Sequence, residues 1–152
     1  MGWAWKYINR HLDRERITLA ANYLGSARSA VDDAVADARE RRQFNRSIGQ
    51  FQSIVRMLAD MATELEAGRW LTRMAAWRYD KGLPCRKEAS MAKLFVSEML
   101  QRVTTGCMQL LGGHAYTHDH DMQRHWRDGR NATVGGCTSQ IQSQLIAREL
   151  GL

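Results

Sequence analysis

The stretch "ITLAANYLGSARSAVDDAVADA", residues 17–38, decides the fold of this chain. Its apolar residues recur at steps of three and four, the repeat of one face of an α-helix. They are Ile17, Ala20, Ala21, Leu24, Ala27, Val31, Ala34, Val35 and Ala38. Because so many are alanines, a neighbouring helix can approach closely. The stretch therefore predicts a long helix packed against others, ending near residues 41–47, where the apolar repeat is lost.

Similar repeats cover most of the remaining sequence. A second helix is expected from Ser47, where Ser47 and Gln50 have capping-box spacing, to the stop signals at Gly82 and Pro84. Three more are expected over residues 86–111, 122–128 and 138–150. The first three helices would each be roughly 35–50 Å long at about 1.5 Å per residue. No strand pattern is evident. We therefore expect one all-α domain, residues 1–152, built as an antiparallel four-helix bundle with a short extra helix.

Composition narrows the range of partners and compartments. The net charge of +6 comes from 22 basic and 16 acidic residues spread along the chain, so no nucleic-acid partner is expected. No apolar run approaches the roughly 20 residues that span a bilayer, so no membrane association is expected. Three cysteines without metal-type spacing suit a reducing compartment. We expect a cytoplasmic protein, in the bacterial cytosol or, if eukaryotic, in the mitochondrial matrix.

Several blocks of the sequence carry a family resemblance. They are "LDRERITLAANYLGSARSAVDDAVADARERRQF" (12–44), "FQSIVRMLADMATELEAGRW" (51–70), "KEASMAKLFVSE" (87–98), "QLLGGHAYTHDHDMQRHWRD" (109–128) and "TSQIQSQLIAREL" (138–150). In order and spacing they resemble the C-terminal helical domain of the flavin-dependent acyl-CoA dehydrogenases. The family's N-terminal helical domain and middle β-domain have no counterpart here. The resemblance therefore implies the C-terminal part of a longer enzyme, with a stand-alone domain as the alternative.

The resemblance also implies a reaction and its partners. Members of the family use FAD to dehydrogenate an acyl-CoA thioester between its α and β carbons. They pass the electrons to an electron-transfer flavoprotein and typically form homodimers or homotetramers. Because FAD and acyl-CoA also contact the other domains, we expect this chain alone to be inactive.

The position of the catalytic base is unusual. In the family, the loop before the last helix usually reads Tyr-Glu-Gly-Thr-Ser, and its glutamate abstracts the α-proton. Aligning Thr138 and Ser139 places Gly136 at the position of that glutamate, and glycine cannot accept a proton. The isovaleryl and long-chain branches instead carry the base on the first helix, in a Leu-x-x-Glu-Arg stretch. By that resemblance, "LDRER" (12–16) makes Glu15 the base.

Asp13, Glu15 and Arg16 in this stretch each have a second interpretation. A glutamate in the first turn of a helix is favourable simply because it opposes the helix dipole. Arg16 matches a residue beside the thioester pocket, as Gly136 does, and Asp13 matches one near the pantetheine arm. The alternative for Asp13 and Arg16 is an exposed ion pair at a helix start.

Three segments match positions that contact FAD in the family, partly across a subunit boundary. The matching residues are Arg41, Gln43, Phe44, Phe51, Gln52, Gln109, Leu110, Leu111, Gly112, Gly113, Thr138, Ser139 and Gln140. Arginine suits pyrophosphate because its planar fork binds two oxygens at once. Asn45 replaces a usual glycine but tolerates left-handed backbone. Alternatively, these segments are a basic loop with Phe44 in the core and Gln52 solvated, a glycine cap and an ordinary N-cap.

The turn over residues 114–125 concentrates four histidines and two aspartates. A metal site is one reading, but the spacing lacks the pattern of closed zinc sites, and the family has a metal-free turn here. We therefore expect no metal.

Two other functions remain open. A catalytically silent partner could complete the FAD site of another subunit, a reading that Gly136 favours and Glu15 opposes. A flavin monooxygenase of the same fold, acting on a substrate without CoA, is the other.

Overall fold

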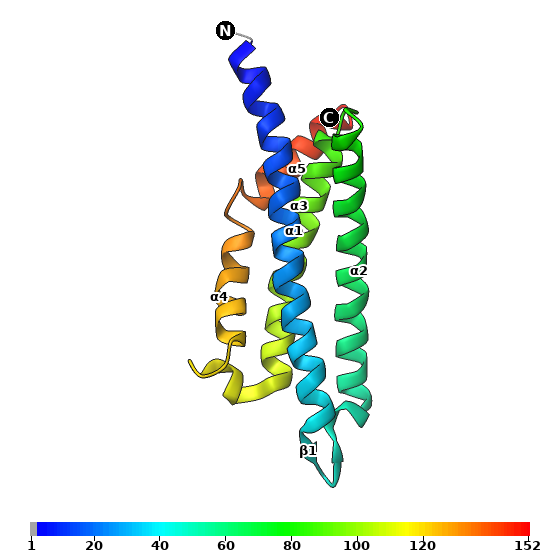
Figure 1. Cartoon of the computed structure of the whole chain (residues 1–152), viewed down its shortest axis with the longest axis vertical. Helices are drawn as coiled ribbons and strands as arrows, with labels where there is room; N and C mark the ends of the chain where they lie inside the picture. Colours follow the sequence, from blue (N-terminus) through cyan, green and yellow to red (C-terminus); the bar gives the residue numbers. More distant parts are fainter. Residues whose placement is uncertain (1–2) are drawn as a thin grey trace.

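The computed structural model describes residues 3–152, with side chains described for residues 7, 8 and 11–152. The fold is all-helical, as predicted: α1 (Trp3–Glu40), α2 (Gln52–Asp80), α3 (Arg86–Leu111), α4 (Met122–Ala132) and α5 (Ser139–Glu149). Of the three long helices, α2 runs antiparallel to both α1 and α3, and α3 contacts each of the other four helices (Figure 1). Two short 3₁₀ helices, η1 (Ile48–Gln50) and η2 (Gly112–Tyr116), lie in the connections.

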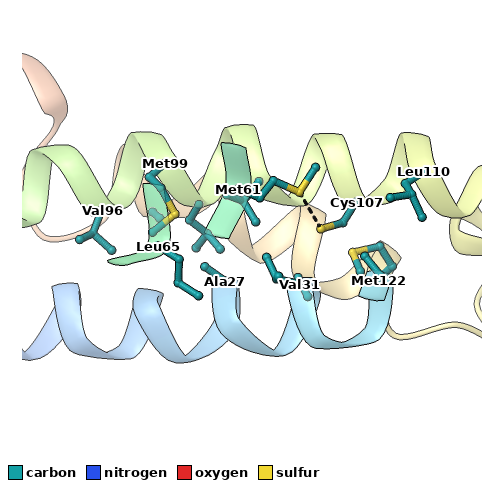
Figure 2. Packing of buried hydrophobic residues seen from close by; sticks show 14 of the residues in the cluster. Ala27, Val31, Met61, Leu65, Val96, Met99, Cys107, Leu110 and Met122 are labelled. Carbon is teal, nitrogen blue, oxygen red and sulfur yellow. Dashed lines mark hydrogen bonds between the residues drawn. The ribbon is translucent and has the colours of Figure 1, made fainter. Parts of the chain in front are cut away.

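The core lies along α3 (Figure 2). Ala20, Ala27, Ala30 and Ala34 have no exposed surface, so the alanine face of α1 lies directly against its neighbours. Larger side chains from α2 and α3 fill the space between the helices, and Cys107 Sγ lies 3.5 Å from Met61 Sδ. Small residues on α1 thus permit close approach, while methionines and leucines on the partner helices supply most of the buried apolar volume.

Helix boundaries mostly follow the prediction. The third helix spans residues 86–111 as expected, α4 runs four residues further than expected, and Thr138 is the N-cap of α5. The predicted capping box is wrong: Ser47 makes no side-chain cap bond, and α2 begins at Gln52 after η1. The first helix begins at Trp3 and has 38 residues. At 1.5 Å per residue its length is about 57 Å, beyond the expected range.

A small β-hairpin between α1 and α2 was not predicted. Strands β1 (Arg42–Gln43) and β2 (Arg46–Ser47) pair antiparallel, at the lower end of the bundle in Figure 1. The loop residues Phe44 and Asn45 both have left-handed backbone, with φ of 51° and 63°. Two positive φ values are what the tightest hairpin turns require. A ladder of two residues is too short to leave a pattern of alternation in the sequence.

Within residues 3–152, no helix has both the length and the apolar character that crossing a bilayer would require.

Candidate functional site

The first part of the site is a stripe on α1 that faces the loop before α5. Glu15, Leu19 and Tyr23 follow one another at one-turn intervals on the helix. Glu15 and Leu19 line a cavity of about 240 Å³ together with His11, Arg14 and Thr18. Burial raises the pKa of Tyr23, and the negative charge of Glu15 raises it further. Glu15 is half-buried on the same face of α1 as Leu19 and Tyr23.

The loop meets the stripe at two glycines. A Cβ atom built on Gly136 would overlap Leu19 Cδ1, and one built on Gly135 would lie 3.6 Å from the Tyr23 hydroxyl oxygen. Gly136 and Cys137 have left-handed φ values of 62° and 75°. Leu19 thus fills the space in which a side chain at position 136 would begin. As folded, the loop has no room for a carboxylate there, whereas Glu15 lies one helical turn before Leu19.

The expectation that Glu15 opens a helix is wrong. Because α1 begins at Trp3, Glu15 lies about three turns inside it, beyond the reach of the N-terminal dipole. The helix dipole therefore gives no reason for a glutamate at this position.

Asp13 and Arg16 are not an exposed pair at a helix start either. They are 8% and 5% exposed, and Arg16 Nη1 lies 2.8 Å from Asp13 Oδ1. Arg86 on α3 extends the network, with its Nε 3.8 Å from Asp13 and its Nη1 3.8 Å from Glu149. Burial raises the pKa of Asp13, and the charges of Arg86 and Arg16 oppose that rise. Arg16 Nε is buried without a hydrogen-bond partner in the described part of the chain.

Asp13 also borders a second cavity, separate from the one that Glu15 lines. This cavity of about 330 Å³ lies between α1 and the α2–α3 connection, where its other lining residues are Tyr79, Gly82, Leu83, Pro84 and Cys85. The buried ion pair therefore lies beside open space.

Sequence reasoning missed Lys93, which is fully buried on α3. Its Nζ donates hydrogen bonds to the carbonyl oxygens of Ala132, at 3.0 Å, and Cys137, at 2.6 Å. Burial lowers the pKa of Lys93. Its spacing to Val96 and Leu100, three and seven residues on, is the signal that places it on the inner face.

The beginning of α5 is held by further polar contacts. The Thr138 hydroxyl accepts a hydrogen bond from the Ile141 amide at 3.4 Å, which makes it an N-cap. Ser139 donates to Glu98 at 2.5 Å, and the buried Gln142 donates to the Gly136 carbonyl at 3.3 Å. Gln140 is exposed. Of the three predicted cofactor residues here, only Gln140 has a side chain that points to solvent without a bond to this chain.

The hairpin and the end of α3 form an open groove of about 350 Å³. Seven predicted cofactor residues line it: Arg41, Gln43, Phe44, Phe51, Gln109, Leu110 and Gly112. Phe44 is 87% exposed, so the alternative that places it in the core is wrong. Its ring packs edge-on against Phe51, with the centroids 6.2 Å apart. The groove therefore combines an exposed aromatic surface with a basic edge.

Besides Thr138, Ser139 and Gln140, three predicted cofactor residues lie outside the lining of this groove. Leu111 is buried, and its carbonyl accepts a hydrogen bond from Arg41 Nη1 at 3.0 Å. Gln52 and Gly113 are exposed beside the groove. Gly112, with φ of 73°, ends α3 in a conformation that favours glycine.

The hairpin of the groove lies at the lower end of the bundle, and the loop before α5 lies in its upper half (Figure 1). The α5 start contacts α3 at Glu98, and the hairpin contacts it at Leu111. Thirteen residues of helix separate these contacts by about 20 Å. Within one chain, the groove residues therefore do not lie next to Thr138, Ser139 and Gln140.

The histidine-containing turn has its own packing. The rings of His114 and His120 meet edge to face, with centroids 5.2 Å apart, and His120 Nδ1 accepts a hydrogen bond from the Met122 amide. Among the described residues, no group of three or more His, Cys, Asp or Glu side chains is arranged to hold a metal ion.

Comparisons with known proteins point to one family. Residues 3–151 match the family model described as acyl-CoA dehydrogenase, C-terminal domain. A probable acyl-CoA dehydrogenase, YngJ of Bacillus subtilis, is 42% identical over 91% of this chain and 37% of its own length. The caffeyl-CoA reductase–Etf complex subunit CarC of Acetobacterium woodii is 40% identical over 90% of this chain and 36% of its own length.

Solved structures agree. Butyryl-CoA dehydrogenase from Megasphaera elsdenii superposes with a TM-score of 0.93 at 35% identity, covering 96% of this chain and 38% of that one. PigA with FAD and proline superposes with a TM-score of 0.90 at 30% identity, covering 93% of this chain and 37% of that one. The chain thus spans little more than a third of the length of these relatives.

Proposed function

This chain belongs to the acyl-CoA dehydrogenase family, and we propose that it is the C-terminal domain of a longer FAD-dependent enzyme that dehydrogenates an acyl-CoA thioester. Relatives in the family are named as acyl-CoA dehydrogenases, and PigA, a structural relative, was solved with FAD and proline. The observation that carries the proposal is the arrangement of Glu15, Leu19 and Gly136. It leaves a carboxylate beside the loop where the loop itself has none.

Glu15 is the proposed base. The α-proton of a thioester is weakly acidic, so its removal needs a carboxylate in contact with it and partly shielded from water. Glu15 is half-buried and borders a cavity that Leu19 also lines, and Leu19 in turn packs against Gly136. When bound, FAD would supply the acceptor for the β-hydrogen and its electron pair.

Asp13 and Arg16 are proposed to bind the substrate near this base. The unpartnered Nε of Arg16 is a buried donor with capacity for one more acceptor, such as a thioester carbonyl. Asp13 borders the cavity of about 330 Å³, which suits an extended arm such as pantetheine. Gly136 presents only backbone to the substrate.

The residues of the hairpin groove fit the adenosine and pyrophosphate side of FAD. Arg41 and the exposed ring of Phe44 offer a charged fork and a flat apolar face. Thr138, Ser139 and Gln140 would serve the flavin end through backbone and side chain at a helix N-terminus. These segments lie about 20 Å apart along α3, and the resemblance implies that FAD is contacted across a subunit boundary, so we propose that two copies of the chain complete each FAD site.

The same reasoning supports the proposed partners. A homodimer or homotetramer would bring the groove of one copy to the loop of another. Trp70, Met74 and Trp77 are exposed on one face of α2 and offer apolar surface for such contacts. The Acetobacterium relative is named as a subunit of an Etf complex, which supports an electron-transfer flavoprotein as the electron acceptor. The bacterial cytosol stays the predicted location.

The second candidate is a catalytically silent partner. The packing of Leu19 on Gly136 favours it, because the usual position of the base is closed. Such a subunit would complete the FAD site of another and would turn over no substrate.

Activity of the longer protein tests both candidates. We expect acyl-CoA-dependent dye reduction, and a loss of about 10²–10⁴-fold in turnover for Glu15→Gln with unchanged FAD content. Glu40→Gln, an exposed glutamate at the end of α1, is the matched control and should keep the parent activity. Equal activity of parent and Glu15→Gln would rule out Glu15 as base, and an inactive parent would favour the silent partner. The isolated chain should be inactive and should purify without stoichiometric FAD.

A further inference from the structure

We propose that Lys93 is a positioning residue, whose ammonium group fixes the Cys137 peptide and so holds the loop before α5 against the Glu15 face of α1. The importance of this loop for catalysis rests on the proposed function. The contacts that hold it do not.

Lys93 connects three helices at one atom. Its Nζ donates to the carbonyl of Ala132, the last residue of α4, and to that of Cys137, which precedes the N-cap of α5. The side chain itself belongs to α3 and has no exposed surface. A carbonyl at a helix C-terminus carries partial negative charge, so the ammonium group is stabilised at α4 while it binds the loop.

The loop needs such a contact because its backbone is unfavourable. Gly136 and Cys137 are successive left-handed residues, and Cys137 carries a Cβ atom that disfavours this region. A left-handed non-glycine residue persists only where surrounding contacts hold it. The hydrogen bond from Lys93 to the Cys137 carbonyl acts on that residue directly.

No ion pair fixes Lys93 within the described part of the chain. Burial opposes the ammonium form of Lys93, and the charge of Arg16 opposes it further, while Cys137 and Glu98 favour it. The Cys137 carbonyl at 2.6 Å is the shorter of the two contacts of Nζ. The ammonium group of Lys93 is thus held chiefly by the carbonyl oxygens of Ala132 and Cys137. In turn, it fixes the positions of these two oxygens.

Other contacts transmit this geometry to the site. The Ser139 amide donates to the Thr133 carbonyl at 3.2 Å, and Gln142 donates to the Gly136 carbonyl. Gly136 in turn packs against Leu19, one turn from Glu15. Removing the ammonium group should release Cys137 and let Gly136 move away from Leu19.

Amide hydrogen exchange and NMR shifts of the 152-residue chain test the proposal. Lys93→Met keeps the length of the side chain and removes its charge. Val96→Ala is the matched control, because Val96 lies one turn further on α3, is equally buried, and packs in the core. Lys87→Met, at a half-buried lysine of the same helix, controls for loss of charge.

We expect Lys93→Met to shift the amide signals of residues 135–139 and to speed exchange at Ser139 about tenfold beyond the change in global stability. Val96→Ala should speed exchange only in proportion to its loss of global stability, and Lys87→Met should leave the loop unchanged. If Lys93→Met behaves like Val96→Ala, Lys93 is an ordinary core residue and the proposal is wrong.

A second measurement needs no substitution, in case Lys93→Met does not fold. In the labelled parent chain, the Lys93 ammonium should exchange slowly with water and show a coupling from Nζ to the Cys137 carbonyl carbon. A freely exchanging amine without that coupling would overturn the proposal. Neither readout requires flavin or thioester, so an inactive longer protein would refute the proposed function and leave this result standing.

Discussion

Leu19 and Gly136 share one position in space: the Leu19 side chain occupies the place where a Cβ atom of residue 136 would lie. The two residues come from α1 and from the loop before α5, more than a hundred positions apart. Because they pack together, the residue at position 136 in the loop and the residue at position 19 on α1 constrain each other. A side chain at position 136 would therefore have to displace the end of the Leu19 side chain.

This relationship predicts a coupling between two substitutions. Gly136→Glu should destabilise the chain, because the new side chain meets Leu19 and the left-handed φ disfavours it, by about 1–3 kcal/mol from overpacking alone. Leu19→Ala should relieve part of that loss, with a coupling energy of about 0.5–3 kcal/mol in a double-mutant cycle followed by urea unfolding. Gly135→Ala, whose Cβ would meet nothing closer than 3.4 Å, is the control. Strictly additive effects would contradict the shared position.

The buried ion pair should be costly to break. Asp13→Asn leaves the Arg16 guanidinium buried without its carboxylate, so we expect a loss of about 3 kcal/mol in the free energy of unfolding. Asp32→Asn removes the partner of Arg28 in an exposed pair on the same helix, whose closest N–O distance is also 2.8 Å. That control should cost under about 1 kcal/mol, because solvent screens exposed charges. Equal losses in the two variants would mean that burial adds nothing to the Asp13–Arg16 interaction.

Cys107 predicts a dependence of stability on alkaline pH. Burial raises the pKa of its thiol from 9.0 to about 12 in the folded chain. Above pH 9 the unfolded chain loses this proton while the folded chain keeps it, so the unfolded state binds fewer protons and stability falls as pH rises. The contribution is at most about 1.4 kcal/mol per pH unit.

Urea unfolding between pH 8 and 11 of the parent chain and Cys107→Ala checks this slope. Cys107→Ala should be less stable at pH 8, because the core loses the sulfur atom that lies against Met61. Its stability should nevertheless fall less steeply above pH 9 than that of the parent. Parallel curves would show that the thiol ionises equally in both states.

The three free cysteines should differ in their reaction with a thiol reagent. Cys137 is exposed, while Cys85 and Cys107 are buried and have raised pKa values. Because the thiolate is the reactive form, we expect one rapid equivalent on the native chain, absent in Cys137→Ser, and two more on unfolding. A rapid second equivalent in Cys137→Ser would mean that one of the buried thiols is accessible.

Much of the fold was predictable because it depends on local repeats. The apolar stripe beginning at Ile17 predicts a helix by its periodicity, and the glycine that follows Leu111 predicts the end of another. Both helices are present. The Ser47 capping box failed because a hairpin and η1 take the backbone groups that such a cap would serve. The beginning of α1 at Trp3 lies well before the stripe that starts at Ile17, although Trp5, Ile8 and Leu12 also stand at steps of three and four.

The site was only partly predictable. The resemblance named Glu15, Gly136 and the groove residues, and the structure places seven of the thirteen proposed cofactor residues around one groove. The resemblance did not indicate Lys93. A single lysine in an apolar helix is taken to be solvent-exposed unless its partners, here Ala132 and Cys137, are known. Nor did it indicate that Asp13 and Arg16 are buried, because burial depends on Arg86 and Glu149 from other helices.

By itself, the sequence determined that this chain is a bundle of long helices, that its loop before the last helix lacks a carboxylate, and that its first helix carries one. These properties depend on residue identity and on spacing along one segment. Only the tertiary structure decided that Leu19 closes the space at Gly136, that Lys93 holds Cys137, and that the hairpin groove and the start of α5 contact α3 about 20 Å apart. Such contacts join residues far apart in the chain, and they exist only once packing has set the distances between the helices.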